Sequence, residues 1–215
     1  MTANILILCA AGMLVSAFLM VGQKSLFTTI RLYGLQSLLL GIVAATIAIS
    51  EARHELFVTV ALTVALKAIL IPWFLMRTVN QIGIRREIEP FLNTPVTLLI
   101  CLGLTVVGYR VSSGFEEGAQ NVGHHLIGVA LSLMLIGLFL MVSRKKAITQ
   151  ILALLTVENA VFLVAVGVTS GIPLIVEFGI AFDVMLAVLV LGILVLRIVS
   201  RFDSMDVSRL SDLKW

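Results

Sequence analysis

Charged side chains are scarce in this 215-residue chain: Asp, Glu, Lys and Arg make up 13% of it, against about 25% in soluble domains. This scarcity excludes an ordinary soluble protein. Cysteine is rare too. Cys9 and Cys101 lie far apart in apolar segments, with no CxxC motif or Cys/His cluster. The sequence therefore predicts no iron–sulfur or zinc site within the chain, and both thiols are expected to be small buried hydrophobes.

The first apolar segment lacks the marks of a cleaved leader. No Lys or Arg precedes it and no small-residue cleavage site follows it, so we interpret it as a retained span rather than a signal peptide.

Long apolar segments are what the chain does have, since 60% of its residues are hydrophobic. A membrane-spanning helix needs about 20 such residues, and about seven segments qualify. They predict an all-α, polytopic transmembrane helix bundle. The fourth segment is the weakest, because it is long enough only with the flanking Phe91 and Val111. The segments are Ala3–Val21, Tyr33–Ser50, Leu56–Met76, Pro95–Tyr109, His125–Val142, Ala147–Val168 and Pro173–Leu196.

Basic residues gather on one side of these spans. They lie after the first, third and fifth segments and in the tail, whereas the other side holds only Arg53 and Arg110. The positive-inside rule therefore predicts an outside N-terminus and a cytoplasmic C-terminus. The residues on the basic side are Lys24, Arg31, Arg77, Arg85, Arg86, Arg144, Lys145, Lys146, Arg197, Arg201, Arg209 and Lys214.

We expect three regions: an N-terminal three-helix unit over residues 1–76, a cytoplasmic connection with two helices over 77–143, and two helices with a cytoplasmic tail over 144–215. The fifth span belongs with the last region. The first three spans and the last three spans cross the membrane with the same succession of directions. This fits either an internal duplication or coincidence.

Two carboxylates lie deep in the last two spans. Glu158 is about 18 Å from Lys146, and Asp183 is about 21 Å from Arg197, at the helical rise of 1.5 Å per residue. Both fall near the middle of a hydrocarbon core about 30 Å thick. Two close carboxylates in a low dielectric cannot easily both ionise, so such a pair can hold and release a proton.

A buried lysine accompanies them. Lys67 lies about 15 Å from the cytoplasmic end of its span, and Pro72 removes the hydrogen bond to the carbonyl of Ala68. The freed carbonyl favours water and a bend near the lysine. Three such charges predict a proton relay of Glu158, Asp183 and Lys67. The alternative is buried ion pairs that only fix helix packing.

Three more polar residues are weaker candidates for the relay. Gln36 lies in the second span, and Asn159 follows Glu158 directly. Glu177 lies near the outer interface, where a solvated carboxylate is ordinary.

Three segments carry a family resemblance: VENAVF at Val157–Phe162, EFGIAFDVMLAVLVLGILVLRI at Glu177–Ile198, and FDSMDVSRLSDLK in the tail. With LYGLQSLLL and the span around Lys67, they make the chain resemble hydrogenase-4 component E, a membrane subunit of group 4 [NiFe]-hydrogenases and formate hydrogenlyase complexes. Arg144–Lys214 is also similar to the K-type subunit of complex I and the C subunit of Mrp antiporters.

The resemblance implies residue roles. In the K-type family, glutamates on two successive helices belong to the hydrophilic axis of the membrane arm. Glu158 matches the first, with a nearby Asn-Ala, whereas Asp183 stands where that family has the second glutamate.

The resemblance also implies a subunit without its own catalytic centre, in a bacterial or archaeal cytoplasmic membrane. The NiFe centre and iron–sulfur clusters would belong to a peripheral arm, and antiporter-like subunits would flank the chain. Two alternatives stay open. An Mrp-type cation/proton antiporter subunit shares the carboxylates but is about half as long. A seven-helix receptor or retinal pump fits the topology, although the last span has no lysine for retinal.

Overall fold

The computed structural model describes residues 2–50, 57, 60–61, 63–82, 93–115, 121–144 and 146–168, and all of its regular elements in these ranges are helical. The elements are α1 (Thr2–Gly22), α2 (Leu26–Ser50), the π-helix η1 (Val64–Leu70), α4 (Ile71–Ile82), α5 (Thr94–Ser112), the short 3-10 helix η2 (Ser113–Phe115), α6 (Asn121–Ser143) and α7 (Ala147–Val168).

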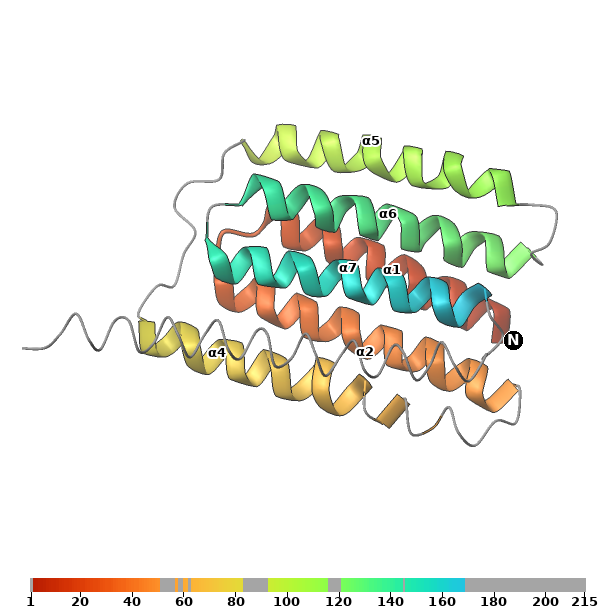
Figure 1. Ribbon diagram of the computed structural model, residues 1–215, viewed down its shortest axis with the longest axis horizontal. Coiled ribbons are helices and arrows are strands. Elements are labelled where there is room, and N and C mark those ends of the chain that lie inside the picture. The colour runs from red at the N-terminus through yellow and green to blue at the C-terminus, as the bar shows by residue number, and fades with distance from the viewer. Residues whose placement is uncertain are drawn as a thin grey trace, which may run out of the picture. The chain divides into compact units, whose positions relative to one another are not determined.

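Two helical hairpins form the centre of the bundle. α1 packs on α2, and α6 packs on α7, because the connection inside each pair is only a few residues long. The hairpins then meet, α1 against α6 and α2 against α7. Figure 1 shows α5 on the outside of α6 and α4 on the outside of α2. The described helices therefore surround an interior where α1, α2 and α7 come together next to η1.

The exposed and buried residues are distributed as in a bilayer protein. Large apolar side chains lie on the outside, such as Leu8 at 74% exposure and Val142 at 81%, while the polar Gln36 and Asn159 are fully buried. Apolar side chains gain nothing by turning inward when the surroundings are lipid, whereas polar groups must find partners inside the protein. Five described helices (α1, α2, α5, α6 and α7) are long and apolar enough to cross a membrane.

The helices agree with the predicted spans in most places. α1, α5, α6 and α7 cover their predicted segments, and α7 has the predicted bounds. The predicted third span continues as η1 and α4 to Ile82, although part of its beginning lies outside the described residues. The seventh span also lies outside them. The orientation and the three-region division stay predictions.

The second predicted span began too late. α2 starts at Leu26, about two turns before Tyr33. Hydropathy alone places the start of the span after Arg31. Arg31 is exposed on this helix, however, and does not break it. Thr29 also donates from its hydroxyl to the carbonyl of Ser25 at 3.0 Å, which fits its place in the first turn.

Glycine sets the closest approach between α5 and α6. A Cβ placed on Gly108 would lie 2.7 Å from the backbone nitrogen of Ser132 and 2.9 Å from its Cα. The Ser132 hydroxyl lies across the same contact, where it donates to the carbonyls of Gly128 and Thr105. The two backbones can meet here only because one side carries no side chain.

Gly108→Ala is therefore expected to lower the free energy of unfolding by about 1–3 kcal/mol, because the new methyl group meets backbone that cannot rotate away. Gly103→Ala on the same helix is the matched control, since nothing lies within 4 Å of its Cβ position. Thermal unfolding of the purified protein in detergent measures both. Equal midpoints for the two variants would contradict this packing.

Candidate functional site

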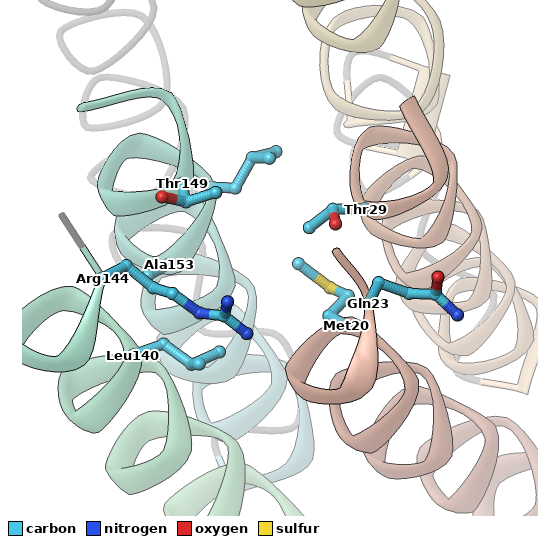
Figure 2. A pocket seen from close by; sticks show the side chains of 8 residues that line it. Met20, Gln23, Thr29, Leu140, Arg144, Thr149 and Ala153 are labelled. Carbon is cyan, nitrogen blue, oxygen red and sulfur yellow. The ribbon is translucent and has the colours of Figure 1, made fainter. Parts of the chain in front are cut away.

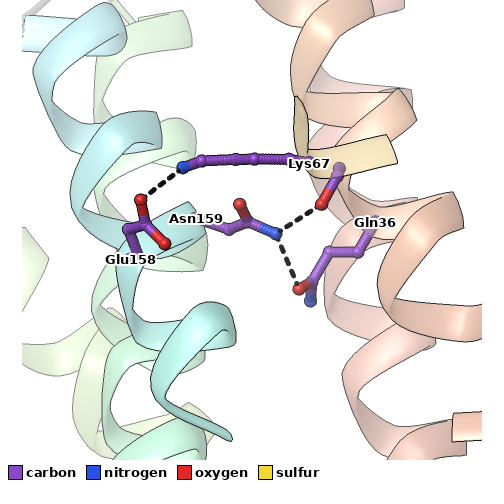
Figure 3. A network of polar contacts seen from close by, with 5 residues as sticks. Gln36, Lys67, Glu158 and Asn159 are labelled. Carbon is purple, nitrogen blue, oxygen red and sulfur yellow. Dashed lines mark hydrogen bonds and ion pairs between the residues drawn. The ribbon is translucent and has the colours of Figure 1, made fainter. Parts of the chain in front are cut away.

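An ion pair lies at the centre of the bundle. The ammonium nitrogen Nζ of Lys67, on η1, is 3.0 Å from Oε1 of Glu158, on α7 (Figure 3). The two side chains are only 1% and 4% exposed. A single charge at the centre of a membrane helix costs about 2.5–3.5 kcal/mol, and an opposite charge within contact distance offsets part of that cost. The pair is therefore one neutral unit made from two charged residues.

An aromatic ring also lies beside Lys67. Lys67 Nζ lies 5.5 Å from the centroid of the Phe162 ring. Phe162 follows Glu158 by four residues on α7, which places both side chains on the same face of that helix. A cation within about 6 Å of a ring face is attracted to it. One face of α7 therefore offers Lys67 both a carboxylate and a ring.

A layer of amides lies beside the ion pair. The side-chain nitrogen Nδ2 of Asn159 donates to Gln36 Oε1 at 3.3 Å and to Ser37 Oγ at 3.1 Å (Figure 3). Gln36 Nε2 in turn donates to the backbone carbonyl of Met13 at 3.2 Å. All of these side chains are buried. The layer connects α7, α2 and α1, so the turn that carries Glu158 is held by hydrogen bonds as well as by packing.

The backbone around Lys67 is a π-helix. The N–H of Ile71 bonds to the carbonyl of Leu66, five residues back, and Pro72 follows with no N–H to give. π-helical turns are rare and frequently lie at functional sites. They change the direction in which side chains leave a helix, and here Lys67 points at α7. The π-helical turn ends immediately before the proline.

Two glycines of α2 make room for η1. A Cβ on Gly34 would lie 3.3 Å from Cγ of Pro72 and 3.4 Å from the carbonyl oxygen of Ala68. A Cβ on Gly41, two turns later, would lie 2.6 Å from Cγ2 of Val64. The carbonyl that Pro72 leaves without its usual partner therefore faces Gly34, and α2 supports η1 near both of its ends.

Among the predicted relay residues, the structure brings four together: Lys67 and Glu158 in contact, with Gln36 and Asn159 in the adjoining layer. Asp183 and Glu177 lie outside the described residues. Glu158 is the sole acidic residue within the described ranges.

Sequence reasoning missed Ser37 and Phe162. Signals for both were present. Ser37 follows Gln36 directly, and Phe162 is one helical turn after Glu158.

The chain resembles known proteins over its whole length. It is 31% identical over 206 residues to the protein named "Uncharacterized protein Rv0085" of Mycobacterium tuberculosis, covering 95% of this chain and 94% of that one. It is 28% identical over 219 residues to proteins named "Hydrogenase-4 component E" of Escherichia coli K12 and Shigella flexneri, covering all of each chain. The chain belongs to the hydrogenase-4 component E family.

No family model and no solved structure matches the chain. The site places a carboxylate, a group that can accept a proton, in contact with an ammonium group and beside an aromatic ring.

Removing one member of the pair is expected to cost more stability than removing both. Lys67→Met or Glu158→Leu alone leaves a buried charge without its partner, which typically costs about 3–5 kcal/mol. The double variant replaces both charges by apolar groups, and its free energy of unfolding is expected to be well above that of either single variant. Denaturant unfolding in detergent gives the coupling free energy as a double-mutant cycle. Additive losses would show that the pair contributes no coupling.

Proposed function

We propose that this chain is a non-redox membrane subunit of a membrane-bound [NiFe]-hydrogenase complex, and that its buried charges form part of the path along which protons or Na⁺ cross the membrane. The observation that carries the proposal is the Lys67–Glu158 contact at 3.0 Å, buried on both sides. Ionisable residues within membrane spans are costly, and they commonly mark ion paths. The full-length similarity to proteins named as hydrogenase-4 components supports the choice of complex.

Glu158 is the proton-carrying group in this proposal. It accepts a proton, releases Lys67 from the ion pair, and pairs again after it passes the proton on. Lys67 modulates this exchange, because its positive charge favours the ionised carboxylate and so favours release of the proton. Asn159 and Gln36 keep the turn of α7 in place through their hydrogen bonds. Asp183 and Glu177 are proposed to extend the path towards neighbouring subunits.

The rest of the complex follows from the family resemblance. The nickel–iron centre and iron–sulfur clusters are proposed to lie in a peripheral arm, so that this chain has no catalytic centre of its own. Antiporter-like subunits are proposed to flank it in the cytoplasmic membrane of a bacterium or archaeon. Electron transfer in the arm would then change the protonation of Glu158 from a distance.

A second candidate is a subunit of an Mrp-type cation/proton antiporter, where a buried carboxylate and lysine serve the same chemistry without redox partners. The match over the whole length of hydrogenase-4 component E ranks this candidate lower. The metal content of the affinity-purified native complex separates the two. Stoichiometric nickel indicates a hydrogenase, and a nickel-free complex of antiporter subunits indicates the alternative.

The relay role is tested with Glu158→Gln in the whole complex reconstituted into vesicles. Dye-linked hydrogenase turnover is expected to stay within about twofold of wild type, because the redox centres lie elsewhere. The proton gradient is expected to fall by an order of magnitude or more, since an amide cannot carry the proton. Fluorescence quenching of a pH-sensitive dye measures the gradient.

Two further variants separate the relay from packing. Lys67→Gln/Glu158→Gln contains no unpaired charge, so it restores packing and is still expected not to pump. Glu158→Asp keeps the carboxylate and is expected to retain part of the pumping. Normal proton translocation by Glu158→Gln at normal turnover would exclude the relay role.

A further inference from the structure

The amide oxygen of Asn159 is a buried acceptor in the middle of the bundle. The Asn159 side chain is fully buried, and its nitrogen Nδ2 donates to Gln36 and Ser37. Its oxygen Oδ1, however, accepts no hydrogen bond from any described residue. Buried polar atoms in proteins almost always have a partner, so an unsatisfied one calls for an explanation.

The neighbouring amide fixes which way Asn159 faces. Gln36 donates from Nε2 to the carbonyl of Met13 and therefore presents its oxygen to Asn159. That oxygen can only be met by a donor, which is Nδ2 of Asn159. A flipped amide would bring two oxygens together, so it would not satisfy Oδ1. Figure 3 shows Oδ1 turned towards the Lys67 side chain, while Nδ2 points at Gln36.

Lys67 brings hydrogen-bond donors to this oxygen. Phe162 follows Glu158 by four residues and Asn159 by three, so its ring lies on the face of α7 that both side chains share. The ammonium Nζ lies 5.5 Å from the centroid of that ring and 3.0 Å from Oε1 of Glu158. It carries three N–H groups on a flexible stem. One N–H can therefore turn to Asn159 whatever else the ammonium contacts.

The predicted seventh span offers little that could take the place of Lys67. Glu177 and Asp183 are its only side chains with nitrogen or oxygen between Pro173 and Leu196. An ionised carboxylate has no hydrogen to donate. The donor that suits Oδ1 is therefore the ammonium already beside α7.

A neutral oxygen already binds a buried cation elsewhere in this fold. Arg144, directly after α6, is 7% exposed, and its Nη2 donates to the backbone carbonyl of Val21 at 2.6 Å. Figure 2 shows this guanidinium reaching from α6 towards α1. Hydrogen bonds from a charged donor are shorter and stronger than those between neutral groups. The Asn159 oxygen is well suited to such a bond, because the two hydrogen bonds that Nδ2 donates polarise the amide.

We propose that Oδ1 of Asn159 is a second acceptor for the ammonium of Lys67, which it receives when Glu158 is protonated and gives back when Glu158 ionises. This inference rests on the proposed function, in which Glu158 gains and loses a proton. The proton forms an O–H bond on the carboxylate, while the ammonium keeps its three hydrogens and only moves between two oxygens. Asn159 is thus a positioning residue, which keeps the lysine charge hydrogen-bonded in the protonated half of the cycle.

The movement of the ammonium is tested by solid-state NMR on the full chain in lipid bilayers, with ¹⁵N in lysine and ¹³C at the asparagine amide carbon. Glu158→Gln stands in for the protonated carboxyl group. The dipolar coupling between Lys67 Nζ and Asn159 Cγ is expected to rise about twofold or more over wild type, because the ammonium enters hydrogen-bond range. Lys67→Met removes this coupling and so assigns it. An unchanged coupling in Glu158→Gln would overturn the proposal.

The effect on ion movement is tested with Asn159→Leu in the whole complex in vesicles. Leucine has a similar size but no oxygen, so pumping is expected to fall by about tenfold while dye-linked turnover persists, the factor that corresponds to one hydrogen bond to a charged group. Ser37→Ala is the matched control. It also weakens the amide layer but leaves Oδ1 in place, so it is expected to pump several-fold faster than Asn159→Leu.

The outcomes separate this inference from the proposed function. If Glu158→Gln pumps normally, the relay fails, yet the NMR coupling still decides whether Asn159 receives the ammonium. Equal pumping by Asn159→Leu and Ser37→Ala overturns the positioning role, because the oxygen would then make no difference. If Asn159→Leu does not assemble, the coupling in Glu158→Gln decides, since that variant keeps Asn159. If Glu158→Gln does not fold, the comparison of Asn159→Leu with Ser37→Ala decides.

Discussion

Lys67 and Glu158 come from distant parts of the chain and meet where a bilayer supplies no water to either of them. Each charge alone is expensive at that depth, so the fold has to bring them into contact and keep them there. The π-helical turn directs Lys67 towards α7, and Gly34 and Gly41 let α2 support that turn closely. The ion pair therefore depends on backbone features that lie outside it.

The neighbouring amides are also buried polar groups that need partners inside the protein, but they carry no charge. Asn159, Gln36 and the carbonyl of Met13 bond across three helices, and each of these bonds replaces one that water would otherwise make. Apolar packing between membrane helices is weakly specific, because lipid is as good a partner as leucine. The polar layer thus fixes how α1, α2 and α7 are positioned around Glu158. In the proposed relay such a frame matters, because proton transfer needs donor and acceptor within hydrogen-bond reach.

The sequence predicted the helices well and the site only in part. Long apolar segments gave the bounds of α7, and the helical rise placed Glu158 and Lys67 at membrane depth. Rise gives a height along the membrane normal, but it does not give the direction in which a side chain points. That direction depends here on the π-helical turn, which no residue pattern announces. Similar depth alone therefore does not tell whether Asp183 or Lys67 lies against Glu158, and the described contact is with Lys67. In the sequence Arg144 is one of several basic loop residues, because its burial arises from helix ends that meet in three dimensions.

A lysine and a glutamate together behave differently from two carboxylates. Two carboxylates share one proton because they repel each other, and their response is set mainly by the distance between them. A lysine–glutamate pair is neutral when the carboxylate is ionised, so protonation creates a net positive charge in the membrane interior. Any neighbouring negative charge favours that state, and any neighbouring positive charge opposes it. In the proposed relay, the charges of neighbouring subunits would therefore decide how readily Glu158 accepts a proton.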